Sequence, residues 1–214
     1  MSRRPGNVAI SVRDISWRPM EALLGLAGYS FVAAVTPGPN NVVLWSIGLR
    51  FGYRAAIPYL LGIPIGVGLM VLGAAAGLGV LIATVPALGI GLKVVGSVYL
   101  LYLAWQVVRI SAVEEADVAS APGFGQSLAF RFVNPKAWFF VLSAVAAFRP
   151  AGMDLLVGAL LMAIVAMAII IPSAGLWAVG GDTLSRFIRS PRAHRAVNLA
   201  LAIVLIAMVV VIWV

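Results

Sequence analysis

Two proline-centred runs carry the residues best suited to bind a small ligand. The first reads Thr-Pro-Gly-Pro-Asn-Asn at residues 36–41, and the second reads Asn-Pro-Lys at residues 134–136. Proline has no amide hydrogen and its ring clashes with the preceding helical turn, so a helix opens at each run. The backbone groups released there can face a ligand. The residues concerned are Thr36, Pro37, Gly38, Pro39, Asn40, Asn41, Asn134, Pro135 and Lys136.

The chemistry of the two runs suits a ligand that carries both a negative and a positive charge. A helix that restarts near Asn40 points its positive dipole end at the break, which favours a carboxylate. Lys136 adds a cation at the second break, and carbonyls released at residues 33–35 can also face the ligand. The two runs therefore predict a cradle for a zwitterion. The alternative is that the prolines only kink two membrane helices.

Three residues of one later apolar segment are secondary candidates for the site. Lys93 lies near the start of that segment, and a charge inside a membrane is costly enough to suggest a function. The alternative to a function for Lys93 is snorkelling, in which its amine reaches the membrane interface. Tyr99 and Tyr102 lie on neighbouring turns, where they either face a cavity or pack against other helices.

No pattern in the sequence indicates an enzyme, a metal site or a cofactor. The chain has no cysteine, which excludes disulfides, thiol chemistry and Cys-ligated zinc or iron–sulfur clusters. His194 is the only histidine and lies between arginines at a segment edge, and no Gly-x-Ser-x-Gly occurs. We therefore expect no catalytic residues, and a membrane-embedded enzyme is the less favoured alternative.

Composition places these runs in a membrane protein. The 214 residues are 63% hydrophobic and 10% charged, whereas soluble domains are about 45–50% apolar and about 25% charged. Lipid-facing side chains are best left apolar, so a bilayer explains this balance. The net charge of +8 comes from bases between apolar segments, where membrane topology accounts for them. We expect no nucleic-acid partner.

Apolar segments long enough to cross a bilayer position the two runs. A spanning helix needs about 20 apolar residues. Six candidate segments are present, at about 22–49, 55–84, 88–108, 127–148, 155–179 and 196–213. The first and the fourth contain the proline runs. The expected fold is therefore an all-α integral membrane protein with two broken segments.

The polar stretch in the middle of the chain divides these segments into two halves. We expect a single transmembrane domain over residues 20–214, with halves at about 20–109 and 124–214 and a cytoplasmic linker at 110–123. Each half has three segments, and an odd number requires the halves to be inverted relative to each other in the membrane.

The basic residues predict which ends face the cytoplasm. Arginines gather in the first, third and fifth connections, and Lys and Arg mark the cytoplasmic side. Both termini then lie outside, although Arg3, Arg4, Arg13 and Arg18 precede the first segment. Either that segment is a re-entrant hairpin, or the chain starts at Met20 and residues 1–19 are an extension outside the mature protein. The second account is favoured.

Four stretches resemble the LysE/RhtB family of transporters, in order and with matching spacing. They are the Thr-Pro-Gly-Pro-Asn-Asn run, Gly-Leu-Arg-Phe-Gly-Tyr-Arg-Ala-Ala at 48–56, Leu-Lys-Val-Val-Gly at 92–96 with Tyr-Leu-Leu-Tyr-Leu-Ala-Trp at 99–105, and Phe-Arg-Phe-Val-Asn-Pro-Lys-Ala at 130–137. The resemblance extends from about Met20 to the C-terminus.

The resemblance implies a multi-pass exporter of amino acids or their derivatives in the bacterial inner membrane, driven by the proton gradient. Many members have Asp where this chain has Asn40. The missing acid disfavours a basic substrate here, and it leaves open which residue would carry the proton that drives export. The Pro-Asn-Asn form is similar to the branch that exports cysteine and O-acetylserine, so small neutral amino acids are expected. A passive channel or facilitator is the alternative. The sequence does not give the oligomeric state.

Overall fold

Helices make up all the regular structure that the computed structural model describes, which is residues 12–78, 81, 84–110, 121–188 and 190–213, and no strand occurs among them. The elements are α1 (Val12–Val35), α2 (Pro39–Phe51), α3 (Tyr53–Gly73), the short π-helix η1 (Ala74–Leu78), α5 (Pro86–Ile110), α6 (Phe124–Val133), α7 (Pro135–Phe148), α8 (Leu155–Phe187) and α9 (Pro191–Trp213). The expected all-α class is confirmed.

Both proline runs break a helix where the sequence predicts. The chain bends by 55° between α1 and α2 and by 70° between α6 and α7. Each second helix begins with a proline, Pro39 or Pro135, because the first position of a helix needs no amide donor. Asn134 caps α7, and its Oδ1 accepts a hydrogen bond from the Lys136 amide at 3.0 Å.

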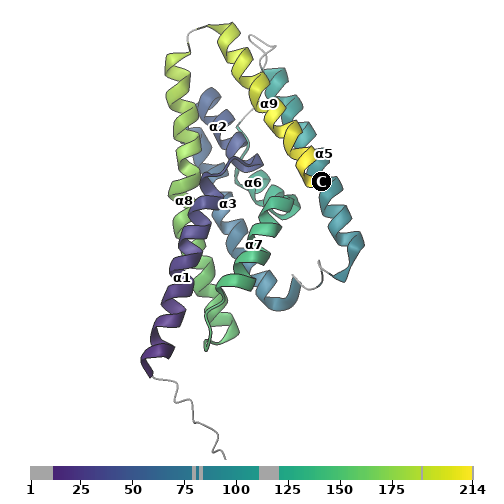
Figure 1. The fold of residues 1–214 in the computed structure, drawn as a ribbon. Coiled ribbons are helices and arrows are strands. Elements are labelled where there is room, and N and C mark those ends of the chain that lie inside the picture. The colour runs from purple at the N-terminus through teal and green to yellow at the C-terminus, as the bar shows by residue number, and fades with distance from the viewer. Residues whose placement is uncertain (1–11, 79–80, 82–83, 111–120, 189, 214) are drawn as a thin grey trace, which may run out of the picture.

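The described helices account for six membrane segments when each bent pair is taken as one span. Four stretches are long and apolar enough alone, at Tyr53–Leu78, Pro86–Trp105, Leu155–Phe187 and Arg195–Trp213, and two bent pairs add two more. A bend of 55° carries the chain onward, whereas a hairpin needs a near reversal. Figure 1 shows α1 ending about halfway along the molecule and α2 lying beyond it, toward the upper end. The re-entrant hairpin is therefore not what the structure contains.

Several segment boundaries differ from the expected ones. The first helix already begins at Val12, and the fifth segment continues to Phe187 beyond its expected end at 179. Polar residues of α8 extend the helix past the apolar stretch, because a helix does not have to end where the hydrophobic residues do. The linker expected at 110–123 falls mostly outside the described residues, as does most of the expected 1–19 extension. The domain bounds stay predictions.

Corresponding elements of the two halves run in opposite directions. In Figure 1, α3 descends while α8 ascends, and α5 ascends while α9 descends. The packing follows the same symmetry, because α1 packs on α8 as α6 packs on α3, and α5 packs on α9. The inversion of the two expected halves is visible in this arrangement.

Close contact between α2 and α8 forms the centre of the molecule. A Cβ added at Gly48 would overlap the carbonyl of Ala178, and one added at Gly181 would overlap the carbonyl of Trp45. Small residues let two membrane helices approach until their backbones touch, which maximises van der Waals contact. This contact holds α2, the second piece of the first broken segment, against α8, which is a long and continuous helix.

This contact predicts that Gly48→Ala destabilises the protein, whereas Gly28→Ala does not. An extra methyl group in a packed interior costs about 1–3 kcal/mol, and a Cβ at Gly28 meets nothing within 4 Å. The apparent melting temperature of the detergent-solubilised protein should fall for Gly48→Ala and stay the same or rise slightly for Gly28→Ala. Equal melting temperatures for the two variants would contradict the packing.

Candidate functional site

A cavity of about 40 Å³ lies between the two helix breaks. A space of this size holds roughly three water molecules, so it admits a carboxylate-sized group, and a whole amino acid requires the surrounding helices to move apart. Six helices contribute to its wall. The lining residues are Ala33, Ala34, Gly38, Pro39, Asn40, Asn41, Ile63, Arg131, Asn134, Lys136, Ala137, Phe140, Ile170 and Ala174.

The Lys136 side chain joins the two breaks. Its Nζ donates a hydrogen bond to the carbonyl oxygen of Pro37 at 2.8 Å and a longer one to that of Thr36 at 3.4 Å. Gly38 makes room for this contact, because a Cβ there would lie 2.9 Å from Nζ. Backbone carbonyls released at the first break therefore accept hydrogen bonds from Lys136, the cation of the second break.

Asn41 closes the first break from its other side. Its Nδ2 donates to the carbonyl oxygens of Ala34 at 2.7 Å and Thr36 at 2.9 Å. Trp177 of α8 also donates to the Ala34 carbonyl, at 3.3 Å. The expectation that the carbonyls of residues 33–35 face a ligand is thus wrong for Ala34, whose oxygen already has two protein donors. The side-chain nitrogen of Asn41 therefore stabilises the backbone of the first break.

Asn40 presents an unpaired donor at the cavity. Its side chain is 4% exposed, and its Oδ1 accepts a hydrogen bond from the Tyr59 hydroxyl at 3.0 Å. Its Nδ2 has no partner. Leaving a buried donor unpaired costs about 1–3 kcal/mol. Tyr59 therefore fixes the orientation of an amide whose free hydrogens suit an acceptor on a ligand.

Arg131 belongs to the cavity wall, although the sequence analysis does not select it as a site residue. Its Nε is buried and has no hydrogen-bond partner. A Cβ at Gly66 of α3 would lie 2.9 Å from Arg131 Cβ and Cγ, so the stem of the side chain packs closely against α3. A permanent charge within the apolar run 127–148 is the signal that could have identified it.

The cavity is positively charged. Arg131 and Lys136 both line it, and no Asp or Glu is among the lining residues. The only ion pair in the described part of the chain joins Arg186 to Asp182, at 2.9 Å within α8. Guanidinium and ammonium groups form their strongest hydrogen bonds with carboxylates and phosphates. The arrangement can therefore hold an anionic group.

The remaining residues of the two runs shape the breaks without lining the cavity. The Thr36 hydroxyl donates to the Val32 carbonyl oxygen at 2.5 Å. Pro37 contributes only its carbonyl to Lys136, and Pro135 lies against α5, where a Cβ at Gly96 would be 3.1 Å from its Cδ. Thr36, Pro37 and Pro135 are thus near the cavity but are not part of its wall.

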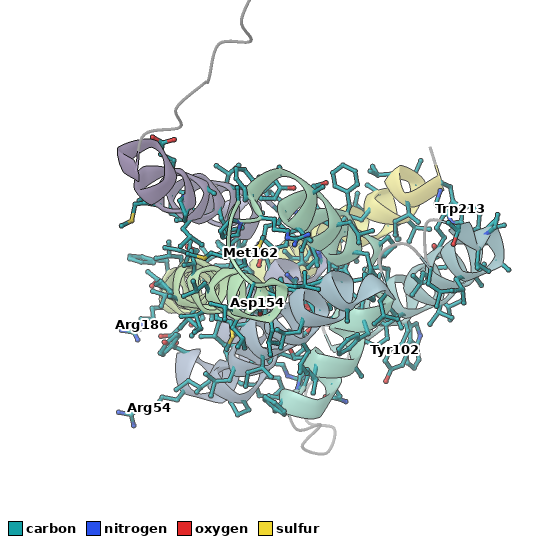
Figure 2. All side chains as sticks on the ribbon, turned by 90° about the horizontal axis from the view of Figure 1, so that it is seen from below. Arg54, Tyr102, Asp154, Met162, Arg186 and Trp213 are labelled. Carbon is teal, nitrogen blue, oxygen red and sulfur yellow. The ribbon has the colours of Figure 1, made fainter. Side chains whose placement is uncertain are left out.

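The structure does not bring the three secondary candidates to the cavity. Lys93 Nζ lies 5.7 Å from the centre of the Trp213 ring, a cation–π contact between α5 and α9. The Tyr99 ring packs on the Phe130 ring with centroids 4.2 Å apart. Tyr102 is 46% exposed, and Figure 2 shows it with Trp213 at the periphery of the helices.

Comparison of the sequence with known proteins identifies a family and several relatives. A family model described as LysE type translocator matches residues 31–214, which include both breaks and Arg131. A cysteine/O-acetylserine efflux protein of Salmonella typhimurium is 30% identical over 183 residues, covering 83% of this chain and 90% of the relative. A protein of the same name from Escherichia coli is 28% identical over the same shares. No solved structure matches the chain.

The bracing role of Asn41 predicts a loss of stability in Asn41→Ala. The substitution removes two hydrogen bonds and leaves the Thr36 carbonyl with fewer donors, at a cost of about 1–3 kcal/mol. Ser46→Ala on the same helix is the matched control, because that hydroxyl bonds only to the Val42 carbonyl of its own helix, at 2.8 Å. Thermal unfolding in detergent should separate the two variants. Identical unfolding curves would remove Asn41 from this role.

Proposed function

This chain belongs to the LysE type translocator family, and on that basis we propose that it exports small neutral amino acids or their derivatives, driven by the proton gradient. It is a multi-pass protein of the bacterial inner membrane, and a transporter rather than an enzyme. Its relatives are named for the efflux of cysteine and O-acetylserine. Both compounds are small zwitterions with one carboxylate.

The observation that carries the proposal is the donor-rich cavity between two helix breaks. Paired broken helices at corresponding points of inverted halves mark the substrate sites of many transporters. Here Asn40 Nδ2 and the Lys136 amine are donors at that point. We assign the substrate carboxylate to these groups, as the two proline runs suggest.

Substrate binding then exchanges partners across the breaks. Lys136 leaves the carbonyl oxygens of Pro37 and Thr36 and pairs with the carboxylate. The released carbonyls accept hydrogen bonds from the substrate ammonium group, which takes the place of the Lys136 ammonium group. Because the 2.8 Å contact joins the two breaks, its replacement by substrate allows the halves to move relative to each other. This couples occupancy to the alternation of access.

The proposed proton coupling needs a titratable group at the cavity. No acid is among the residues that line the cavity, and a buried acid is the usual proton site in a carrier. The absence of such an acid in this lining favours a passive facilitator as the second candidate. Lys136, as a titratable amine at the cavity, is the group to which we assign the proton if export is coupled.

Replacement of Lys136 by Gln should impair transport and leave the fold intact. A hydrogen bond to a charged group contributes about 1.5–3 kcal/mol, so kcat/KM for export should fall by roughly tenfold to a hundredfold. Lys93→Gln is the control, because Lys93 lies against Trp213 and away from the cavity. Export would be measured in proteoliposomes. Unchanged export by Lys136→Gln would take Lys136 out of the site.

Efflux from whole cells tests the function and its driving force together. Cells that express the protein should lose cysteine, O-acetylserine or similar neutral amino acids faster than empty-vector cells, as read by mass spectrometry. Basic amino acids should be retained, because two cations line the cavity. A protonophore should abolish the loss. Efflux that survives the protonophore would establish the facilitator instead, and no protein-dependent loss of any amino acid would refute the proposed function.

A further inference from the structure

Two buried donors at the cavity lack a partner in the structure, and they come from different halves of the chain. They are Asn40 Nδ2 on α2 and Arg131 Nε on α6. Both residues line the same cavity. Two unpaired donors beside one space are best explained by a ligand with two acceptor atoms, and a carboxylate has two oxygens.

The two cationic side chains of the cavity differ in whether they already have hydrogen-bond acceptors. The Lys136 ammonium group already has two carbonyl acceptors, at 2.8 and 3.4 Å. The Nε of Arg131 has none. Arg131 is thus the cation that awaits an anionic partner, and a single carboxylate is sufficient to supply it.

The stem of Arg131 is held by close packing between α6 and α3. Its stem packs against Gly66, and one helical turn earlier a Cβ at Gly62 would lie 2.7 Å from Ser127 Cβ. Both contacts join α6 to α3, a continuous helix. The base of the Arg131 side chain therefore has a fixed position before any ligand arrives, which lowers the entropic cost of binding.

We propose that Arg131 binds the carboxylate of the substrate, with Asn40 Nδ2 donating to the same group, and that this pair restricts transport to compounds with a free carboxylate. The inference rests on the proposed function, because it names the group of an amino-acid substrate that is recognised. Lys136 then adds its charge to the same carboxylate once it has left Pro37. Cationic amino acids are excluded because, besides their ammonium group, they bring a further positive charge to a cavity that two cations already line.

The test compares O-acetylserine with its carboxamide analogue in proteoliposomes. In the wild type, O-acetylserine should be exported and the carboxamide should neither be exported nor compete. Arg131→Gln should lower O-acetylserine export by roughly tenfold to a hundredfold and abolish the preference for the carboxylate over the carboxamide. Arg131→Lys should retain the preference with reduced export, because it keeps the charge and loses the fork of donors.

Controls separate this role from a structural one. Arg149→Gln changes an exposed arginine at the end of α7 and should leave both the rate and the preference unchanged. A purely structural Arg131 would lower export of every compound and leave the preference intact, and that result would overturn the inference. If Arg131→Gln does not fold, the preference measured in Arg131→Lys decides, and its loss with export maintained would count against us.

The two proposals fail in different ways. Wild-type protein that exports no amino acid would refute the proposed function and this inference with it. Wild-type protein that exports O-acetylserine and its carboxamide equally would leave the proposed function standing and overturn the assignment of Arg131.

Discussion

The hydrogen bond from the Lys136 amine to the Pro37 carbonyl is the interaction on which the centre of the molecule depends. It spans 99 positions of sequence and joins the two breaks at which a pair of described helices is bent by more than 40°. Without it, the Pro37 carbonyl would lose its Lys136 donor, whereas the Thr36 carbonyl would keep the Asn41 side-chain amide. The neighbouring bonds, from Asn41 to Ala34 and from the Lys136 amide to Asn134, hold the two ends in place.

Charge at this centre is balanced by dipoles rather than by acids. An isolated charge in a medium of low dielectric constant is costly unless it is paired or well hydrogen-bonded. Carbonyl oxygens meet that need for Lys136, while Arg131 keeps a buried nitrogen without an acceptor. The protein's own residues thus leave two donors at the cavity, Asn40 Nδ2 and Arg131 Nε, without an acceptor. A transporter benefits from this, since a site that is fully satisfied by its own residues would gain little from a substrate.

The sequence predicts the parts of this structure that have a local cause. Proline opens a helix through its own ring, so both breaks and the class of fold follow from the residues alone. The role of Asn41 depends on how far the bend brings it back toward Ala34, which no local pattern gives. The sequence leaves open whether Lys93, Tyr99 and Tyr102 face a cavity, because α5 is apolar on all sides and its orientation comes from packing on α9. Arg131 carries a sequence signal, a charge within an apolar run, but its place in the cavity wall depends on how α6 packs against Gly66 of α3.

The tight fit of Gly38 beneath the Lys136 amine also restricts how this site can diverge. A methyl group at position 38 would stand 2.9 Å from the amine nitrogen, so alanine at 38 requires the flexible end of the Lys136 side chain to shift. Alanine at 38 therefore weakens the contact between the two breaks unless the side chain at 136 changes with it. Specificity in descendants of this protein would then shift more readily through the walls of the cavity, at Ile63, Phe140 or Ile170, than through the breaks themselves.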